Sequence, residues 1–234
     1  MRILMGHNYY QQPGGEGQVF AAECALLESE GHQVFRYTLH NDEMADYSAQ
    51  TMAVATLWHH RVYKEIRSLI QQKRIQIAHF HNTFPLISSA AYYAAQAEGI
   101  PVIQTMHNYR LLCPNALFFR DGKVCEDCLG QPIPWPGVVH RCYRESAVAS
   151  GAVATMLTAH RVLNTWTSKV TKYIVLTEFA RDKFIQGGLP ASKIVIKPNF
   201  VETDPGYQLG EGNYALYVGR LSVEKGLDVL LKAW

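Results

Sequence analysis

Short apolar runs rich in β-branched residues alternate along this chain with longer stretches in which apolar residues recur at helical spacing. Such alternation is typical of βαβ units, in which helices join parallel strands. Each short run is apolar at most positions, as expected for a strand covered on both faces. The pattern predicts an α/β fold with one doubly wound parallel sheet of six strands: Arg2 to Met5, Gln33 to Leu39, Ile75 to Phe80, Val102 to Met106, Lys172 to Leu176 and Lys193 to Lys197.

Helices are expected between the strands. The last of them should end at Gly187 and Gly188, because glycine commonly follows a helix C-terminus. The predicted helices are roughly Gly17 to Ser29, Thr51 to Gln72, Leu86 to Ala97, Ser146 to Lys169 and Glu178 to Gln186.

The stretch from Thr51 to Arg74 has one apolar face and carries five basic residues against one acidic residue, a local charge of +4 (five minus one): Arg61, Lys64, Arg67, Lys73 and Arg74 against Glu65. The apolar face predicts core. The basic face is either simply solvated or a peripheral contact with anionic lipid or an acidic acceptor.

The character of the sequence changes after Asn199. A polar segment with glycine and proline follows and is typical of a linker between domains. Beyond it, Tyr214 to Val218 predicts a new strand and Val223 onward a new helix. One strand and one helix cannot bury their apolar faces alone, so we expect the rest of a second domain after Trp234. The predicted organisation is a first domain at 1–200 with an insertion at 109–145, a linker at 201–213, and the beginning of a second domain at 214–234.

Composition excludes several classes of protein. With 48% hydrophobic and 18% charged residues, the 234-residue chain is not disordered. A formal charge of +2 is too small to suggest nucleic-acid binding, so an anion site would have to be local. The apolar start of the chain stops at Gly6 and lacks the long apolar stretch of a signal peptide. We therefore expect a cytoplasmic protein whose cysteines are kept reduced.

Two segments have the chemistry of an anion site. Gly14 and Gly15 lie between the first strand and the first helix, where the free N–H groups of the helix favour a phosphate. The alternative is a flexible turn. The segment is not G-x-G-x-x-G, and the second strand does not end in the acid that a dinucleotide site needs.

Arg220 and Lys225 flank the start of the last predicted helix, where cations oppose the helix dipole and suggest a missing anion. The alternative is a solvated ion pair of Glu224 with Arg220 or Lys225.

Polar residues also follow the predicted strands. His7 ends the first strand, His81 the third and His107, followed by Asn108, the fourth. Ligands of open parallel sheets bind at the carboxyl ends of the strands, so these side chains are candidate site residues. A single strand-end histidine is more often a packing residue, but several at one edge favour a site.

The loop from Tyr109 to Glu145 is too long for a plain connection and is therefore functional or internally stapled. It holds four of the five cysteines, Cys113, Cys125, Cys128 and Cys142, spaced C-x11-C-x2-C-x13-C. Such a set can hold a structural zinc ion. Reduced thiols, a disulfide such as Cys125 with Cys128, and an iron–sulfur cluster are the alternatives. Cys24, among alanine and leucine, is predicted to be core.

Taken in order, these motifs resemble the retaining glycosyltransferases of family 4, which have the GT-B fold of two facing Rossmann-like domains. The motifs are the Gly14-Gly15 loop, His79-Phe80-His81, His107-Asn108-Tyr109, Leu176-Thr177-Glu178-Phe179, Lys197-Pro198-Asn199, Tyr217-Val218-Gly219-Arg220 and Glu224-Lys225-Gly226.

The resemblance implies a role for each matching position. Gly14 and Gly15 would approach the phosphates of a UDP- or GDP-sugar donor, with Arg220 and Lys225 binding its diphosphate. His107 would be the catalytic residue beside the donor sugar. The other candidates near the acceptor or the donor sugar are His7, His81, Asn108, Glu178 and Asn199. No catalytic metal is implied, because two cations and a helix dipole take its place.

The chain departs from the family in lacking the acidic E-x7-E pair, which should lie past Trp234. We therefore expect an acceptor-side domain that is inactive alone and binds nucleotide sugar weakly. The predicted activity is sugar transfer to a glycan, lipid or small molecule in the cytoplasm, with peripheral contact at the inner face of the membrane. A non-catalytic binding module is the alternative. An oxidoreductase is disfavoured by the missing dinucleotide motif.

Overall fold

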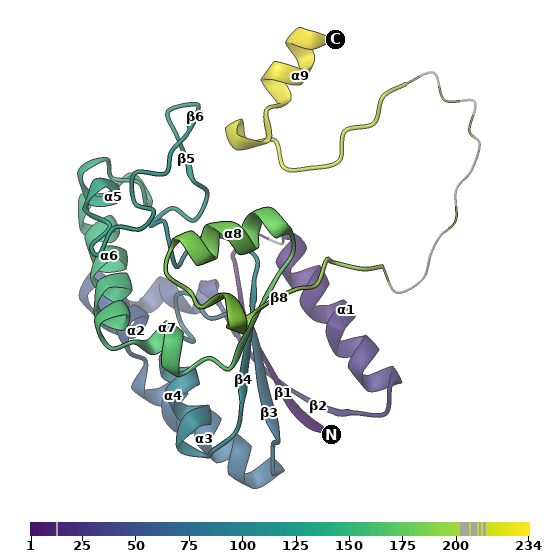
Figure 1. Ribbon diagram of the computed structural model, residues 1–234, viewed down its shortest axis with the longest axis vertical. Coiled ribbons are helices and arrows are strands. Elements are labelled where there is room, and N and C mark those ends of the chain that lie inside the picture. The colour runs from purple at the N-terminus through teal and green to yellow at the C-terminus, as the bar shows by residue number, and fades with distance from the viewer. Residues whose placement is uncertain (13, 202–205, 207–209, 211, 213) are drawn as a thin grey trace.

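The computed structural model describes residues 1–12, 14–201, 206, 210, 212 and 214–234. Six strands form one parallel sheet in the order β2-β1-β3-β4-β7-β8 (Figure 1). The doubly wound parallel sheet expected from the sequence is confirmed. Its strands are β1 (Arg2–Tyr9), β2 (Gln33–His40), β3 (Ile77–Asn82), β4 (Val102–Met106), β7 (Lys172–Val175) and β8 (Ile194–Ile196).

Helices join these strands, and a small antiparallel hairpin interrupts the connection between β4 and β7. The α-helices are α1 (Gly15–Ser29), α2 (Ala49–Leu57), α3 (His60–Lys73), α4 (Ala90–Ala97), α5 (Trp135–Val139), α6 (Ala147–Val162), α7 (Thr165–Ser168), α8 (Glu178–Gln186) and α9 (Leu227–Ala233). Short 3₁₀ helices are η1 (Asn41–Asp46), η2 (Ala191–Lys193) and η3 (Val223–Lys225), and the hairpin pairs β5 (Phe119–Arg120) with β6 (Lys123–Val124).

The two faces of the sheet bury different cores. Leu4 of β1 belongs to the larger core, together with side chains of α3, α4, α6, α7 and α8. Its neighbours Ile3 and Met5 point to the opposite face and pack against Phe20 and Cys24 of α1. Figure 1 shows α1 on the side of the sheet opposite α3 and α4. Strand residues of odd number near β1 therefore face α1.

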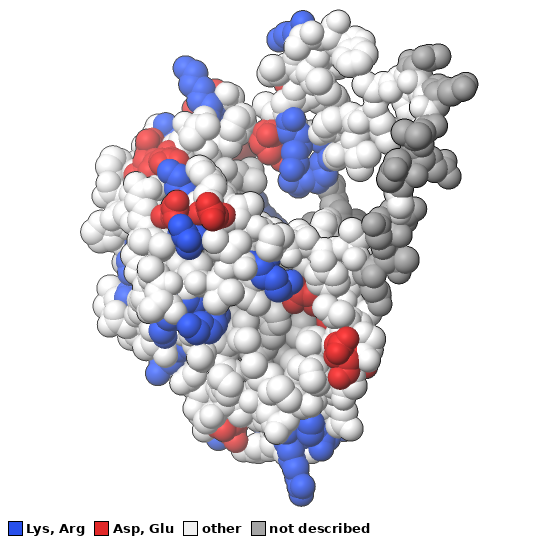
Figure 2. Space-filling model, turned by 45° about the vertical axis from the view of Figure 1, so that its right-hand side comes forward, with Lys and Arg blue, Asp and Glu red and all other residues white. Residues whose placement is uncertain are grey.

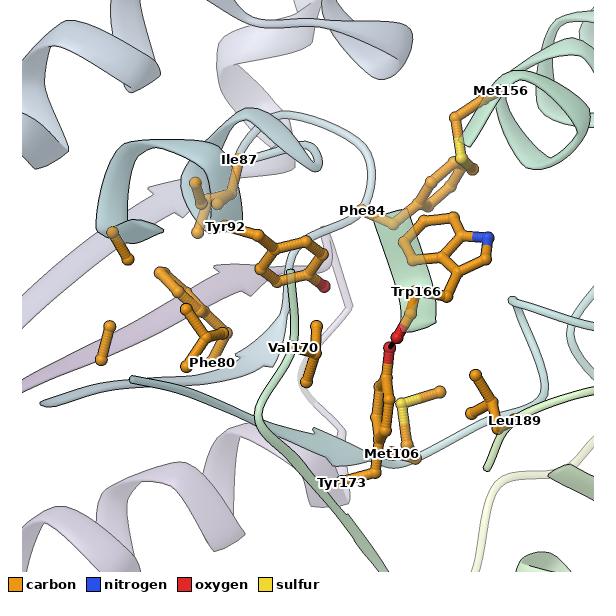
Figure 3. Packing of buried hydrophobic residues seen from close by; sticks show 14 of the residues in the cluster. Phe80, Phe84, Ile87, Tyr92, Met106, Met156, Trp166, Val170, Tyr173 and Leu189 are labelled. Atoms are coloured by element: carbon orange, nitrogen blue, oxygen red, sulfur yellow. Dashed lines mark hydrogen bonds between the residues drawn. The ribbon is translucent and has the colours of Figure 1, made fainter. Parts of the chain in front are cut away.

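Aromatic side chains fill the larger core. Phe80 of β3 packs edge-on against Tyr92 of α4, and Tyr92 in turn meets Trp166 of α7 (Figure 3). The hydroxyl of Tyr173 donates a hydrogen bond of 2.7 Å to the Trp166 carbonyl, so this buried group is satisfied. Large buried rings of this kind supply much of the apolar area that holds a domain of this size together.

The predicted helix from Thr51 to Gln72 is two helices, which corrects the sequence interpretation. The backbone is extended at Trp58 and His59, between α2 and α3. The Trp58 ring packs against Tyr63 and Tyr93, and His59 Nδ1 accepts a hydrogen bond from the Val62 backbone. At the break, two residues leave the helix and gain a contact between partly buried rings and a helix cap, which residue periodicity alone does not reveal.

Other predicted boundaries also move. The helix expected from Leu86 begins only at Ala90. The one expected from Ser146 to Lys169 stops at Val162 and resumes as α7, because Asn164 takes a left-handed backbone with φ of 53°. β1 runs two residues past His7, since its pairing with β2 continues to Tyr9. His7 therefore lies within the strand rather than at its end.

The strand expected from Tyr214 to Val218 is not formed, and α9 begins at Leu227 rather than Val223. A strand requires a neighbour to pair with, and this segment has none in the described part of the chain. Gly226, with φ of 67°, separates the 3₁₀ turn of Val223–Lys225 from α9. Most of the predicted linker, residues 202–205, 207–209, 211 and 213, lies outside the described residues.

Surface charge is mixed. Basic and acidic side chains are interspersed over the face drawn in Figure 2. In α3, Arg61 pairs with Glu65 and Arg67 with Glu98, at 2.7 and 2.6 Å. These contacts favour a solvated basic face for this helix. Within the described ranges, no helix has both the length and the apolar character needed to cross a bilayer.

Candidate functional site

Polar side chains gather where the strand order of the sheet reverses. The chain winds outward from β1 to β2 on one side and from β1 to β3 on the other, so the reversal lies between β1 and β3. In open α/β sheets, the crevice at the carboxyl ends of the strands at this point is where ligands bind. His7 of β1, His81 of β3 and His107 after β4 all lie here, on the face that α1 covers.

His81 joins another predicted site residue, His107, to Glu23, which was not predicted. Its Nδ1 lies 3.0 Å from His107 Nε2, and its Nε2 lies 3.3 Å from Glu23 Oε2 in α1. The side chain of His81 is fully buried, whereas His107 is partly exposed at the rim. The buried histidine therefore connects a carboxylate inside the fold to an imidazole at its surface.

Glu23 is ionised beneath the histidines. Burial acts to raise the pKa of Glu23, but hydrogen bonds from His81 and Lys197 outweigh it and lower the pKa to about 2. Lys197 Nζ, just after β8, lies 2.7 Å from Glu23 Oε1. Because the ionised carboxylate favours a proton on His81 Nε2, we assign the tautomer in which His81 Nδ1 accepts a hydrogen bond from His107 Nε2.

His107 is neutral at ordinary pH. Burial, with smaller effects from His81 and His7, lowers its pKa to about 3. With Nε2 donating to His81, Nδ1 of His107 is left as an acceptor. Nδ1 forms no hydrogen bond within the described residues and is not among their buried polar atoms. The rim of the crevice thus presents one fixed acceptor, suited to a hydroxyl group.

The other two histidines of this edge are packing residues. His7 is 1% exposed and stacks on Phe20, with ring centroids 5.0 Å apart, and burial lowers its pKa to about 4. His79 bonds to Thr105 through Nε2 at 2.8 Å, and burial lowers its pKa to about 3. His7 and His79 are therefore buried, whereas His107 is partly exposed.

Asn108 ties the crevice to the first turn of α1. Its amide donates to Glu16 Oε1 at 3.0 Å and lies 3.4 Å from the Tyr10 hydroxyl. Burial raises the pKa of Glu16, against the opposing effects of Asn108, Arg110 and Arg220. The second oxygen, Oε2, is buried and has no hydrogen-bond partner among the described residues. Such an orphaned acceptor beside a crevice has capacity for one more donor.

The glycine loop is open. Gly14 is the N-cap of α1 and Gly15 its first residue, and a Cβ at either position would meet no atom within 4 Å. No side chain caps this helix end. The free N–H groups of the first turn therefore remain available to an anion.

The two predicted diphosphate-binding cations are not organised around a site. Arg220 pairs with Glu224 at 3.1 Å, which is the ion pair that the sequence offered as the alternative. The charge of Arg220 nevertheless acts to lower the pKa of Glu16, against the larger effect of burial. Lys225 is exposed, and its side chain forms no hydrogen bond or ion pair with a described residue.

Glu178 and Asn199 lie at the expected edge but not in the network. Glu178 begins α8 directly after β7, and Asn199 follows β8. Both are exposed, and neither bonds to another described side chain.

Sequence reasoning missed Glu23 and Lys197 as site residues. A charged residue in the otherwise apolar stripe of Phe20, Cys24 and Leu27 was a signal for Glu23, because carboxylates are rarely buried unless paired. Lys197 follows the last strand in the same way that His107 follows the fourth. Its position at the shared edge could have placed it among the candidates.

Two groups of residues raise the question of a metal. Among the described residues, Glu23, His79 and His81 form the group whose ligand atoms lie within 4.8 Å of one another. The ammonium of Lys197 lies beside them and disfavours a further cation, so hydrogen bonding accounts for this group. The four cysteines of the long loop line one small cavity instead, at a distance from the crevice.

The comparison with known proteins now decides the family. The sequence matches the model of Glycosyltransferase Family 4 over residues 13–205. This chain belongs to glycosyltransferase family 4. An uncharacterized 42.6 kDa protein in the cps region of Klebsiella pneumoniae is 26% identical over 180 residues, which are 75% of this chain and 41% of that protein. The family 4 chain thus spans less than half the length of this relative.

Several solved structures are weakly similar to this chain, with TM-scores below 0.5. UDP-N-acetylglucosamine 2-epimerase from Rickettsia bellii has a TM-score of 0.43 at 14% identity, over 85% of this chain and 45% of the epimerase. HepE of Anabaena in complex with UDP has a TM-score of 0.42 at 14% identity, over 88% and 47%. UGT2 of Phytolacca americana, complexed with UDP-2fluoro-glucose and pterostilbene, has a TM-score of 0.42 at 14% identity, over 86% and 55%. Similarity of this degree does not extend to substrate.

Proposed function

We propose that this chain is the acceptor-side domain of a retaining glycosyltransferase. The reaction moves a sugar from UDP or GDP to a hydroxyl group of a glycan, a lipid or a small molecule. The bond between sugar C1 and the diphosphate breaks, the acceptor oxygen bonds to C1, and the acceptor proton passes to the departing phosphate. The observation that carries the proposal is His107, held by His81 at the crevice where the strand order reverses.

His107 is proposed to position the donor sugar. A neutral imidazole with a pKa of about 3 cannot serve as a proton donor at pH 7, but its Nδ1 can accept a hydrogen bond from a sugar hydroxyl. Such a bond fixes C1 relative to the leaving group and the acceptor, and orientation of this kind lowers the barrier to transfer. Membership of family 4 supports this role.

The leaving diphosphate is proposed to lie over the start of α1. Gly14 and Gly15 leave space for it there, and the N–H groups of the helix favour its charge. Arg220 and Lys225 are proposed to complete this site by releasing Glu224 and turning to the phosphates. Charge that develops on the leaving group is then stabilised by two cations and the helix dipole, without a catalytic metal.

The cellular setting is the remaining part of the proposal. We place the protein in the cytoplasm, with peripheral contact at the inner face of the membrane. Lys64 and Arg74 of the basic helix are available for this contact, because they form no ion pair with a described residue. The acceptor is bound by this domain, and the chain alone is expected to bind nucleotide weakly.

The test is a transfer assay with the protein as its gene encodes it, beside the 234-residue chain alone. Each is incubated with UDP- and GDP-sugars and a panel of hydroxyl acceptors, and product is detected by mass and by the configuration at C1. We expect transfer with the donor configuration kept. For the chain alone we expect a Kd for UDP or GDP weaker than about 1 mM in titration calorimetry. An inverted product would contradict the retaining mode, and absence of transfer from every donor would favour a binding module.

A further inference from the structure

The long loop after Asn108 brings its four cysteines to one place. Cys113, Cys125, Cys128 and Cys142 all line a single cavity of about 10 Å³. A cavity of this size, about 10 to 15 Å³, holds one water molecule or one ion. All four cysteines are free thiols. The fifth, Cys24, lies on α1 and is buried against β1.

The loop has its own short elements, and each delivers a cysteine. The β5–β6 hairpin leads directly into Cys125, whose backbone N–H donates to the Phe118 carbonyl at 2.8 Å. α5 leads into Cys142, whose backbone N–H donates to the Gly137 carbonyl at 2.9 Å. The stretch from Cys113 to Cys142 is thereby folded around one cavity.

The first cysteine is brought in by close packing of α5. A Cβ on Gly137 would lie 2.6 Å from Pro114 Cγ, so only glycine lets α5 approach the turn that carries Cys113. Cys128 lies beside the start of the same helix, with its Sγ 3.9 Å from the Pro134 carbonyl. α5 thus packs against the segments that carry two of the four cysteines.

We propose that these four cysteines bind one structural zinc ion. Four thiolates from a C-x2-C pair and two outlying cysteines are a common tetrahedral zinc-ligand set. Four thiolates around Zn²⁺ leave a net charge of −2. Arg120 lines the same cavity and places beside the sulfurs a positive charge that it shares with Asp127 at 3.1 Å.

Zinc would fill the cavity and cross-link the loop through its four cysteines. No three of the sulfurs lie within 4.8 Å of one another in the described structure, whereas zinc–sulfur bonds of about 2.3 Å bring four sulfurs closer than that. Binding therefore draws the cysteines inward and releases thiol protons.

The loop in turn braces the domain. Glu126, inside the C-x2-C pair, bonds to Lys183 of α8 at 2.7 Å, and Tyr109 stacks on Phe184 with ring centroids 5.8 Å apart. Because the loop begins one residue after Asn108, its rigidity bears on the crevice.

Zinc content is measured first on the unmodified 234-residue chain, purified under reducing conditions and freed of loose metal by dialysis. We expect about one zinc ion per chain by mass spectrometry. Replacement with Co²⁺ should give the strong visible absorption of tetrahedral cobalt with thiolate ligands. After unfolding in the presence of a chelator, all five cysteines should react with a thiol reagent. These measurements need no variant and do not depend on transferase activity.

Variants then assign the ligands. Cys125→Ser and Cys142→Ser, at the two partly exposed positions, should lose most of the zinc, whereas Cys24→Ser makes the same chemical change outside the loop and should keep it. The proposal is overturned by metal-free protein that takes up no cobalt, by only three reactive thiols, which indicates a disulfide, or by iron with sulfide. Zinc retained in both loop variants would also overturn it.

Discussion

His81 Nδ1 and His107 Nε2 lie 3.0 Å apart and join the ends of β3 and β4 by a hydrogen bond. The same ring of His81 reaches Glu23 in α1 through its other nitrogen. One buried imidazole thus fixes the orientation and tautomer of the exposed one. A freely rotating imidazole would lose side-chain entropy on binding a sugar. Because His81 already holds His107 in one orientation, His107 loses less.

The histidine network predicts how stability depends on pH. The pKa values of His7, His79 and His107 are about 4, 3 and 3 in the folded chain, below the usual 6.5. Below pH 6.5 the unfolded chain therefore binds protons that the folded chain does not, and the free energy of unfolding should fall. Glu23, with a pKa of about 2 rather than 4.5, adds to the loss below pH 4.5.

Urea denaturation at intervals from pH 7.5 to 4.5 measures this dependence. His79→Gln can keep the bond to Thr105 and removes one titrating group, so the slope should decrease by up to about 1.4 kcal/mol per pH unit. His140→Gln, at an exposed histidine, is the control. A stability that is constant from pH 7.5 to 4.5 would show that the histidines are not buried as described.

Two glycines should respond in opposite ways to alanine. A Cβ at Gly6 would lie 2.3 Å from Phe80 Cδ1, so Gly6→Ala should destabilise the fold by about 2 kcal/mol or more. Gly15→Ala meets open space and should leave stability unchanged or raise it by up to about 1 kcal/mol. If Gly15 approaches the donor, the same change should nonetheless raise the KM for donor sugar. Thermal unfolding and donor titration measure the two effects, and an unaltered KM would remove Gly15 from the donor site.

Lys197→Met tests the ion pair beneath the histidines. Removal of the ammonium leaves Glu23 buried with a weaker set of partners, and the expected loss is about 1 to 3 kcal/mol of unfolding free energy. It should be smaller than for a fully buried pair, because the Lys197 side chain is 39% exposed. Lys172→Met, at the start of the neighbouring strand β7, is the matched control. Equal stability of the two variants in urea would show that Glu23 does not depend on Lys197.

Arg220→Ala and Lys225→Ala separate stability from donor binding. Arg220 is 62% exposed in its pair with Glu224, and exposed pairs of this kind contribute about 0 to 1 kcal/mol, so neither variant should unfold more readily. Loss of a charge-assisted bond to a phosphate should raise the donor KM about 10-fold or more. Lys232→Ala, in α9, serves as control. Donor kinetics equal to those of the control would leave both cations outside the phosphate site.

The sequence was sufficient for the sheet, because the strands read as short apolar runs, and the central strands β1, β3 and β4 are largely buried. Glu178 to Gln186 was also predicted with its bounds, since two glycines mark its end, and the structure adds a Thr177 cap at its start. The breaks at Trp58 and Asn164 were not predicted. They depend on a ring contact and a left-handed residue, which periodicity does not record.

The site was predicted less completely than the fold. His81, His107 and Asn108 were found because strand ends share one edge of a parallel sheet. Glu23 was missed because it lies on a helix, and its contact with His81 spans nearly sixty positions of sequence. The strand expected at 214–218 failed for a related reason, since local propensity does not supply a pairing partner.

The rate of sugar transfer by the His107→Ala variant tests the proposed role of His107 most directly. The variant should keep its thermal stability to within about 1 to 2 kcal/mol, since His107 is partly exposed, while kcat/KM for transfer should fall by at least about 100-fold. His140→Ala, at an exposed surface position, should transfer as the unmodified protein does. Full transfer by a folded His107→Ala protein would contradict the proposed role of this crevice.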